Sequence, residues 1–367
     1  MCVPSTDLQI NYVNALRHQI EQFIEANPEI KIYGFDIGGG TPTSLDSKVF
    51  ADFMIWIGEL LERQTTTSDF EPSIEGSFET LIENGRASNK SYQIAKAGFK
   101  RLSVGVQSTS DNVLNPLHRN NISVPQMGKA IEEWHRHGIS KINLDLMYGL
   151  PGQTIETIKK DIEVIRELAP EQVTVYEFRI NQLKTNYKPD TDKCYNQYCE
   201  LYNGLSRLGY YGDFGRNTFS RDLTHYGISS YLRHRMFDGW QYKGFGISAQ
   251  SMSRYGVSYN VGKNVAIGKI IGQKWLINHG STYESPTYYR LPPQELLNKF
   301  IAISGYSGGI SLAAARSILG EDFESRYSNQ ISFLLQQNLA TLKSDRIQLT
   351  PTGFRHYGPL LSLFYKR

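Results

Sequence analysis

The stretch IKIYGFDIGGGTPT, residues 30–43, decides the fold class because an apolar, strand-like run ends there in three glycines. A helical pattern follows at once in VFADFMIWIGELLER, residues 49–63, whose apolar residues recur on a helical period. A strand, a glycine-rich turn and an amphipathic helix in this order form the first half of a βαβ unit. The stretch therefore predicts a parallel sheet with helices packed against it.

The same alternation continues along the chain in both directions. Predicted strands and helices alternate in EPSIEGSF (71–78), SYQIAKAGF (91–99), RLSVGVQS (101–108), PQMGKAIEEWHRHG (125–138), INLDLMYGL (142–150), ETIKKDIEVIREL (156–168), QVTVYEFRI (172–180), NQYCELYNGLSRLG (196–209) and YYGDFGRNTF (210–219). The opening segment 7–26 reads as a helix that lacks a preceding strand. Such alternation predicts right-handed βαβ units, in a doubly wound sheet or in a closed or partial barrel.

The rhythm changes after about residue 224, and we predict three parts. Residues 1–224 form an α/β barrel, and residues 225–290, rich in Tyr, Gly and Ser, form an extension that caps it. Residues 291–367 form a small helical domain, with helices in 292–303, 311–319 and 328–342 and a strand in RIQLT, 346–350. The helices and a hairpin make this domain winged-helix-like.

Composition excludes several classes of protein. The 39 basic and 36 acidic residues give a formal charge of +3, too slight to indicate binding to nucleic acid or to an anionic membrane. We find no apolar run of about 18 residues and no secretory signal pattern, so we predict a cytoplasmic protein without a transmembrane segment. Three cysteines make no disulfide framework, and Cys194 and Cys199 read as ordinary residues of one helix.

Polar side chains follow successive predicted strands at the edge where the carboxyl ends of parallel strands meet. Gly38, Gly39 and Gly40, with Thr41 after them, follow the first strand and leave backbone groups uncovered for a ligand. Glu75 ends the next strand. A glycine triplet or a lone glutamate is more often structural than functional.

Three more candidates lie at the strands that follow. Gln107 closes RLSVGVQ and offers a donor and an acceptor, and Arg119 in LHRN could clamp a carboxylate. Asp145 sits among apolar residues in INLDLMYGL, where burial is costly without a partner. Together these features indicate a site for one extended polar ligand.

Five of these motifs, in this order and spacing, resemble the radical S-adenosylmethionine proteins of the oxygen-independent coproporphyrinogen III oxidase group. They are GGGTPTSL, SIEGSF, GFKRLSVGVQS, LHRN and INLDLMYGLPGQT, with weaker similarity in VTVYEFRI, YKGFGISAQS and LTPTGF. The resemblance covers most of the chain and implies a partial (β/α)6 TIM-like barrel.

The resemblance also implies roles for the candidates. Gly38, Gly39 and Gly40, with Thr41, would face the methionine amino group of S-adenosylmethionine, and Glu75 would hold the amino acid part of that ligand. The carboxylate and ribose region would contact Gln107, Arg119 and Asp145.

The family holds a [4Fe–4S] cluster on a C-x3-C-x2-C motif, and the cluster splits S-adenosylmethionine to give a 5′-deoxyadenosyl radical. This chain lacks the cysteine trio, and Cys2 is the one cysteine placed as the last residue of that motif would be. The chain is either a truncated product or a cluster-less relative with a binding role. We favour truncation because the opening helix lacks its strand, and we expect no radical chemistry from the chain as given.

Three functions are compatible with the resemblance. An oxidase of porphyrin synthesis would decarboxylate coproporphyrinogen III with electrons from a flavodoxin or ferredoxin, and a haem-binding chaperone or a radical methyltransferase are the alternatives. Residues near the presumed mouth could serve a flat tetrapyrrole: Tyr148, Tyr176, Arg179, Phe214 and Arg216. A haem ligand could come from the histidines, which include His225, His234 and His279.

Overall fold

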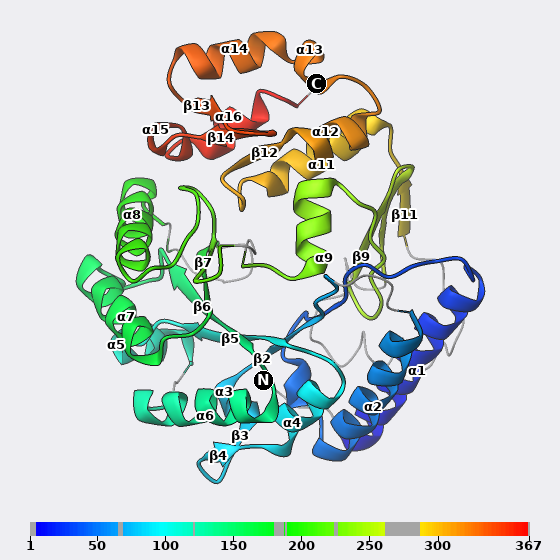
Figure 1. The fold of residues 1–367 in the computed structure, drawn as a ribbon. Helices are drawn as coiled ribbons and strands as arrows, with labels where there is room; N and C mark the ends of the chain where they lie inside the picture. Colours follow the sequence, from blue (N-terminus) through cyan, green and yellow to red (C-terminus); the bar gives the residue numbers. More distant parts are fainter. Residues whose placement is uncertain are drawn as a thin grey trace.

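The computed structural model describes residues 5–64, 69–119, 122–179, 187, 189–223, 227–260 and 287–365. Its main sheet has six strands in the order β1-β2-β5-β6-β7-β8. Their bounds are β1 Asp36–Ile37, β2 Ser73–Gly76, β5 Arg101–Gln107, β6 Lys141–Tyr148, β7 Gln172–Glu177 and β8 Thr218–Ser220. The five strands from β1 to β7 are parallel, so the predicted parallel sheet is confirmed for this part (Figure 1).

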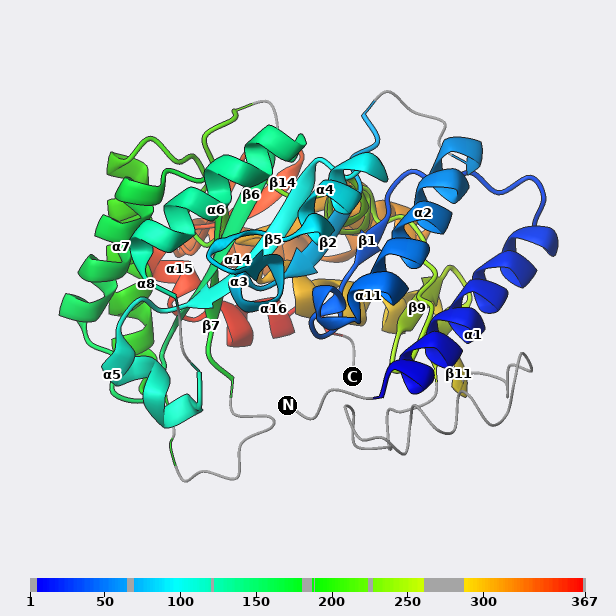
Figure 2. The same cartoon turned by 90° about the horizontal axis from the view of Figure 1, so that it is seen from below.

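The helices of the βαβ units lie along the outer face of this sheet (Figure 2). They are α1 Thr6–Glu25, α2 Ser47–Gln64, α4 Asn89–Lys96, α6 Val124–His137, α7 Ile155–Leu168 and α8 Thr191–Arg207. Short elements between them are η1 Pro42–Ser44, α3 Phe78–Leu81, β3 Ile82–Glu83, β4 Arg86–Ala87, α5 Asp111–Leu114 and η2 Asn115–Leu117. No helix of the described ranges is long and apolar enough to cross a membrane.

Local sequence explains where these helices begin and end. A capping box between Ser123 and Gln126 opens α6, and Gly138 closes it at a φ of 104°. The apolar face that this places inward includes Ile131 and Trp134, both buried in the core. Each unit thus buries one helical stripe against the sheet.

The sixth strand differs from its prediction. Only Thr218 and Phe219 of the predicted segment join the sheet, in strand β8, which runs antiparallel to β7. The chain turns at Asp213–Arg216, where Gly215 has a φ of 91° and the Arg216 N–H donates to the Asp213 carbonyl. Tyr211 then pairs with Ser220, so the chain returns beside itself instead of crossing over as a parallel strand.

The first strand is also shorter than its apolar run. Its ladder with β2 consists of Asp36 and Ile37, and the Phe35 carbonyl also accepts from the Ser73 N–H at 3.0 Å. A Cβ on Gly34 would lie 2.3 Å from the Tyr231 backbone nitrogen. This glycine lets a distant segment pack directly on the backbone at the edge of the sheet.

That segment begins with α9 Ser230–Arg233 and the π-helix η3 His234–Asp238. A three-stranded antiparallel sheet follows in the order β11-β10-β9, with β9 Gln250–Ser253, β10 Gly256–Tyr259 and β11 Thr287–Arg290. Ser230 fixes the segment to the barrel, since its Oγ lies 3.1 Å from both the backbone N and O of Glu71.

The C-terminal residues form helices and a hairpin as predicted, except that the predicted helix 328–342 ends at Gln336 and its last residues, Ala340–Leu342, form strand β13. The elements are α11 Pro293–Ser304, β12 Gly309–Ser311, α12 Leu312–Leu319, α13 Phe323–Arg326, α14 Ser328–Gln336, β13 Ala340–Leu342, β14 Arg346–Leu349, α15 Pro351–Phe354 and α16 Tyr357–Ser362. The strands make one antiparallel sheet in the order β12-β14-β13. This unit lies across the side of the main sheet that the outer helices leave open, with α9 between them (Figure 1).

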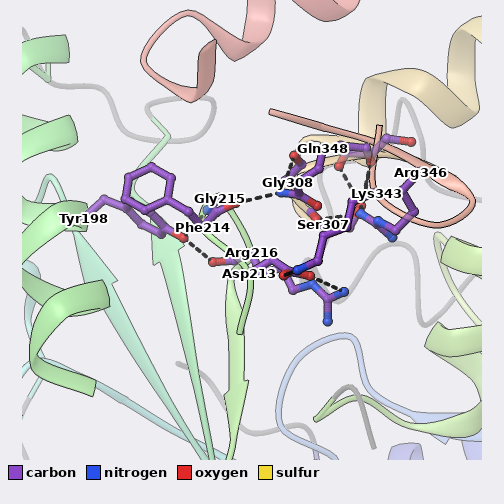
Figure 3. Close-up of polar contacts among 12 residues, drawn as sticks. Tyr198, Asp213, Phe214, Gly215, Arg216, Ser307, Gly308, Lys343, Arg346 and Gln348 are labelled. Carbon is purple, nitrogen blue, oxygen red and sulfur yellow. Dashed lines mark hydrogen bonds and ion pairs between the residues drawn. The ribbon is translucent and has the colours of Figure 1, made fainter. Parts of the chain in front are cut away.

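Polar contacts dock this unit onto the turn before β8 (Figure 3). The Gln348 Nε2 donates to the carbonyls of Phe214 and Gly308, each at 2.9 Å. Asp213 lies between two cations, with Lys343 at 2.7 Å and Arg216 at 2.9 Å. The turn that ends the parallel sheet is therefore also the attachment point of the C-terminal unit.

Candidate functional site

A cavity of about 240 Å³ lies inside the half-barrel. Its polar wall comes from β1, β2, β5 and β7, and its apolar wall from α9, η3 and α11. The lining residues are Asp36, Ile37, Ser73, Glu75, Arg101, Ser103, Thr174, Tyr176, Arg216, Asn217, Thr218, Ile228, Leu232, Arg235, Met236, Phe237, Ile303, Tyr306 and Ser307.

The glycine turn and Glu75 meet at the edge of this cavity. The Gly39 N–H donates to Glu75 Oε2 at 3.1 Å, and a Cβ on Gly38 would lie 2.7 Å from Glu75 Oε1. Gly39 and Gly40 have φ values of 85° and 134°, which side chains rarely adopt, and no atom lies within 4 Å of a Cβ placed there. The turn therefore presents an exposed backbone beside one carboxylate, and Thr41 begins the chain's return into η1.

Glu75 titrates differently from a surface glutamate. Partial burial raises its pKa, while the Gly39 N–H and the nearby Arg101 guanidinium oppose that rise. The Glu75 carboxylate thus has the Gly39 N–H and the Arg101 guanidinium nearby, while part of its surface remains exposed. Such a group suits a ligand that brings its own positive charge.

Asp145 lies deeper on β6 and has the partners that its burial requires. Ser103 Oγ donates to one carboxyl oxygen at 3.1 Å, and Asn143 Nδ2 donates to the other at 2.8 Å. Burial nevertheless raises the pKa of Asp145 to about 7. Since Ser103 is the register partner of Glu75 on the neighbouring strand, Glu75 and Asp145 flank the same strand.

Gln107 ends β5 with a φ of 69°, in the left-handed region. Its amide folds back, because a Cβ on Gly105 would lie 2.8 Å from its Nε2. The strand register shifts between these two residues. Gln107 is half-buried at the carboxyl end of the strand, the edge where the sequence predicts it.

The structure does not bring Arg119 to the cavity, and it does not describe Cys2. Arg119 lies exposed after η2, with its backbone N–H donating to Leu114 O at 3.2 Å, and it does not line the cavity. Cys2 lies outside the described residues, as do His225 and His279.

Two residues of the site have no counterpart among the candidates. Asp36 lines the cavity, and its carboxyl group accepts a hydrogen bond from Ser229 Oγ at 2.7 Å. Loss of contact with bulk water raises the pKa of Asp36 to about 7. Arg101 is buried and donates to Gln172 Oε1 and Ser73 Oγ, each at 2.8 Å. A charged residue among the apolar residues of a strand, as with Asp145, is the signal that could have identified both.

The aromatic and basic residues predicted at the mouth have mixed surroundings. Tyr176 and Arg216 line the cavity. Tyr148 and Phe214 instead pack in the core around Tyr198, with ring centroids 5.7 and 5.3 Å from its ring. Arg179 lies over the Tyr306 ring at 4.9 Å and hydrogen-bonds the Tyr357 hydroxyl.

The described cysteines and His234 are engaged elsewhere. Burial raises the pKa of Cys194 to about 11, and this thiol packs against Gly149. His234 has Asp238 at 2.6 Å from Nδ1 and an Arg233 nitrogen at 3.2 Å from Nε2. Within the described ranges, no group of three His, Cys, Asp or Glu side chains is arranged to hold a metal ion.

Comparison with known proteins agrees with this architecture. Residues 11–165 match the model of the radical SAM superfamily. The haem chaperone HemW of Haemophilus influenzae is 24% identical over 99% of this chain and 90% of its own length. The oxygen-independent coproporphyrinogen III oxidase of Bradyrhizobium diazoefficiens is 29% identical over 59% of this chain and 48% of its own length.

A solved structure extends the likeness to the whole fold. Coproporphyrinogen III oxidase from Escherichia coli superposes with a TM-score of 0.72, over 100% of this chain and 85% of that one, at 18% identity. The TIM-like partial barrel is therefore confirmed as the fold. Residues 11–165 thus match the radical S-adenosylmethionine superfamily, and the chain as a whole is similar in sequence to a haem chaperone and in fold to a coproporphyrinogen III oxidase.

Proposed function

We propose that this chain binds S-adenosylmethionine at the glycine turn and acts as a haem-binding chaperone. The observation that carries the first half is the Glu75 carboxylate, held by the Gly39 N–H beside an open stretch of glycine backbone. Support for the second half is the full-length likeness to a protein named a haem chaperone. In sequence, the oxidase of Bradyrhizobium diazoefficiens aligns with 59% of the chain, whereas the Escherichia coli oxidase shares the fold over all of it.

The donor set at the turn fits the amino acid end of S-adenosylmethionine. Its ammonium group would bind Glu75 and carbonyls of Gly38–Gly40, and its carboxylate needs a donor such as the Gln107 amide. Asp145, on strand β6, would accept from the ribose hydroxyls. The Glu75 carboxylate also favours the positive sulfonium over a neutral analogue.

The described residues do not fit a [4Fe–4S] cluster. Such a cluster takes thiolate ligands from a short loop, whereas the described cysteines, Cys194 and Cys199, both lie on α8. Burial raises the pKa of both thiols and so disfavours thiolate. We therefore assign the residues to binding and positioning, and derive no radical step from them.

Removal of the Glu75 charge tests the S-adenosylmethionine site. Glu75→Gln should weaken binding about tenfold or more, because a charge-assisted contact to the ammonium group contributes about 1.5–3 kcal/mol. Isothermal titration calorimetry measures the affinity, and Glu59→Gln, an exposed glutamate of α2, is the matched control. Equal affinity in Glu75→Gln and wild type would place the ligand elsewhere.

A haem titration tests the chaperone function. We expect the wild-type protein to shift the haem absorbance band with one-to-one stoichiometry. The second candidate, coproporphyrinogen III oxidase, is favoured by the cavity arginines, which suit an acidic substrate. Anaerobic conversion of coproporphyrinogen III without a haem complex would replace the chaperone proposal with the oxidase.

A further inference from the structure

Three arginines line the cavity, and their surroundings differ. Arg101 donates to two side chains, Ser73 and Gln172, and lies close enough to Asp36 to lower its pKa against the effect of burial. Arg216 is paired with Asp213 at 2.9 Å in the docking turn (Figure 3). Each of these two positive charges therefore has acidic groups close by.

Arg235 is held differently, by aromatic rings. Its guanidinium lies over the Tyr242 ring at 4.4 Å and the Tyr231 ring at 5.9 Å. Its Nη1 donates to the Tyr231 hydroxyl at 3.1 Å. These contacts fix the direction of the side chain but supply no negative charge, since a cation–π contact only partly replaces an anion.

The cation on Arg235 has no carboxylate within ion-pair distance in the part of the chain that the structure describes. Its Nε is buried and has no hydrogen-bond partner among those residues. A guanidinium keeps its charge in folded proteins, so an unmatched buried donor of this kind costs free energy that an anion would recover. The Arg235 side chain is thus prepared for a negatively charged ligand group.

The other residues of the cavity indicate which kind of anionic ligand group Arg235 would bind. Leu232, Met236, Phe237 and Ile303 surround the space beside Arg235, so the anion sits on an apolar body. Asp36 and Glu75 line the same cavity and would repel a doubly charged phosphate more strongly than a singly charged carboxylate.

The size of the cavity indicates how much of the ligand enters. At about 240 Å³ it is smaller than pockets that enclose a complete drug-sized ligand, which measure roughly 300–1,000 Å³. It would therefore accept one carboxylate-bearing arm of a larger molecule. We propose that Arg235 binds a carboxylate side chain of the tetrapyrrole, an inference that rests on the proposed haem-binding function.

The test compares haem with its dimethyl ester, both titrated in the same detergent buffer and followed by absorbance. Wild-type protein should bind haem more tightly than the ester, because the ester has lost the charge that Arg235 recognises. Arg235→Gln should weaken haem binding about tenfold and leave the ester unchanged, so the preference disappears. Arg254→Gln is the matched control, since this exposed arginine also lies over a tyrosine ring but outside the cavity.

Other outcomes have distinct meanings. If Arg235→Gln weakens both ligands equally or neither, Arg235 does not read the carboxylate and the inference fails while haem binding stands. If the wild type binds neither ligand, the proposed function fails and the inference falls with it. Arg235→Lys keeps the charge and guards against misfolding: it should retain part of the preference for haem over the ester, and full loss in a folded Arg235→Lys variant would also contradict the inference.

Discussion

Asp36 brings a carboxyl group to the edge of the sheet, on the wall of the cavity. Burial raises its pKa to about 7, whereas an aspartate in an unfolded chain titrates near 4. The folded protein therefore holds this proton between about pH 4 and 7, and the unfolded chain releases it. By linkage, the contribution of Asp36 to stability is greatest at low pH and is lost as the pH rises through 7.

Asp36→Asn should remove this part of the pH dependence. The amide oxygen can still accept from Ser229 but never becomes charged. We expect the free energy of unfolding of the variant, relative to wild type, to rise by on the order of 1 kcal/mol between pH 5.5 and 8.5. This value is smaller than the pKa shift alone would give, because Asp36 faces the cavity and is partly screened. Urea unfolding at both pH values measures it, with Asp52→Asn on α2 as control. A difference that does not change with pH would mean that Asp36 is ionised throughout.

Some residues of the candidate site could be predicted from the sequence, and others could not. Gly38–Gly40, Glu75, Gln107 and Asp145 could be placed at one edge because each follows or lies in a strand of a parallel sheet. Arg119 lies in a loop, whose path no periodicity determines. Arg235 could not be found, since its role depends on having no carboxylate of the described residues within ion-pair distance, and that is a property of the folded chain.

At the scale of elements, a buried aspartate of α7 holds the loop that follows β5. Asp161 accepts from the Thr109 N–H at 2.6 Å, from the Thr109 hydroxyl at 2.7 Å and from the Ser108 hydroxyl at 3.2 Å. Burial raises its pKa to about 6. This helix thereby fixes the direction in which the chain leaves Gln107, at the edge where the candidate site lies.

Asp161→Ala should destabilise the protein by about 2–3 kcal/mol, because it leaves buried donors of the loop unsatisfied. Asp161→Asn should cost less, since its amide oxygen still accepts from Thr109. Urea denaturation monitored by circular dichroism measures both. If the two variants were equally stable, the hydrogen bonds to the loop would not be what Asp161 contributes.

The long helices were largely predictable, since they follow their apolar periods: α1, α2, α4, α6, α7, α8, α11, α12 and most of the segment of α14. Strand β8 differs from its prediction, because it runs antiparallel to its neighbour after the chain reverses at Gly215. The direction of a strand depends on the turn before it. Composition alone does not reveal that the Asp213–Arg216 turn also forms hydrogen bonds with Lys343 and Gln348 of the C-terminal unit.

At the scale of the molecule, the C-terminal unit completes the cavity of the barrel. Ile303, Tyr306 and Ser307 of this unit line the same cavity as Asp36 and Glu75 of the barrel, so both parts contribute to its wall. The fold class could be predicted because strand and helix alternate so regularly. The division at residues 224 and 290 stays a prediction, because this shared cavity shows a joint surface and not where one part ends.

In this chain, we propose, the glycine turn and Glu75 hold S-adenosylmethionine. A crystal structure of the protein with S-adenosylmethionine tests it most directly. We predict the ligand's amino group at about 3 Å from the Glu75 carboxylate and from carbonyls of Gly38–Gly40. A ligand bound away from this turn, or a saturated solution that leaves no ligand there, would contradict the claim.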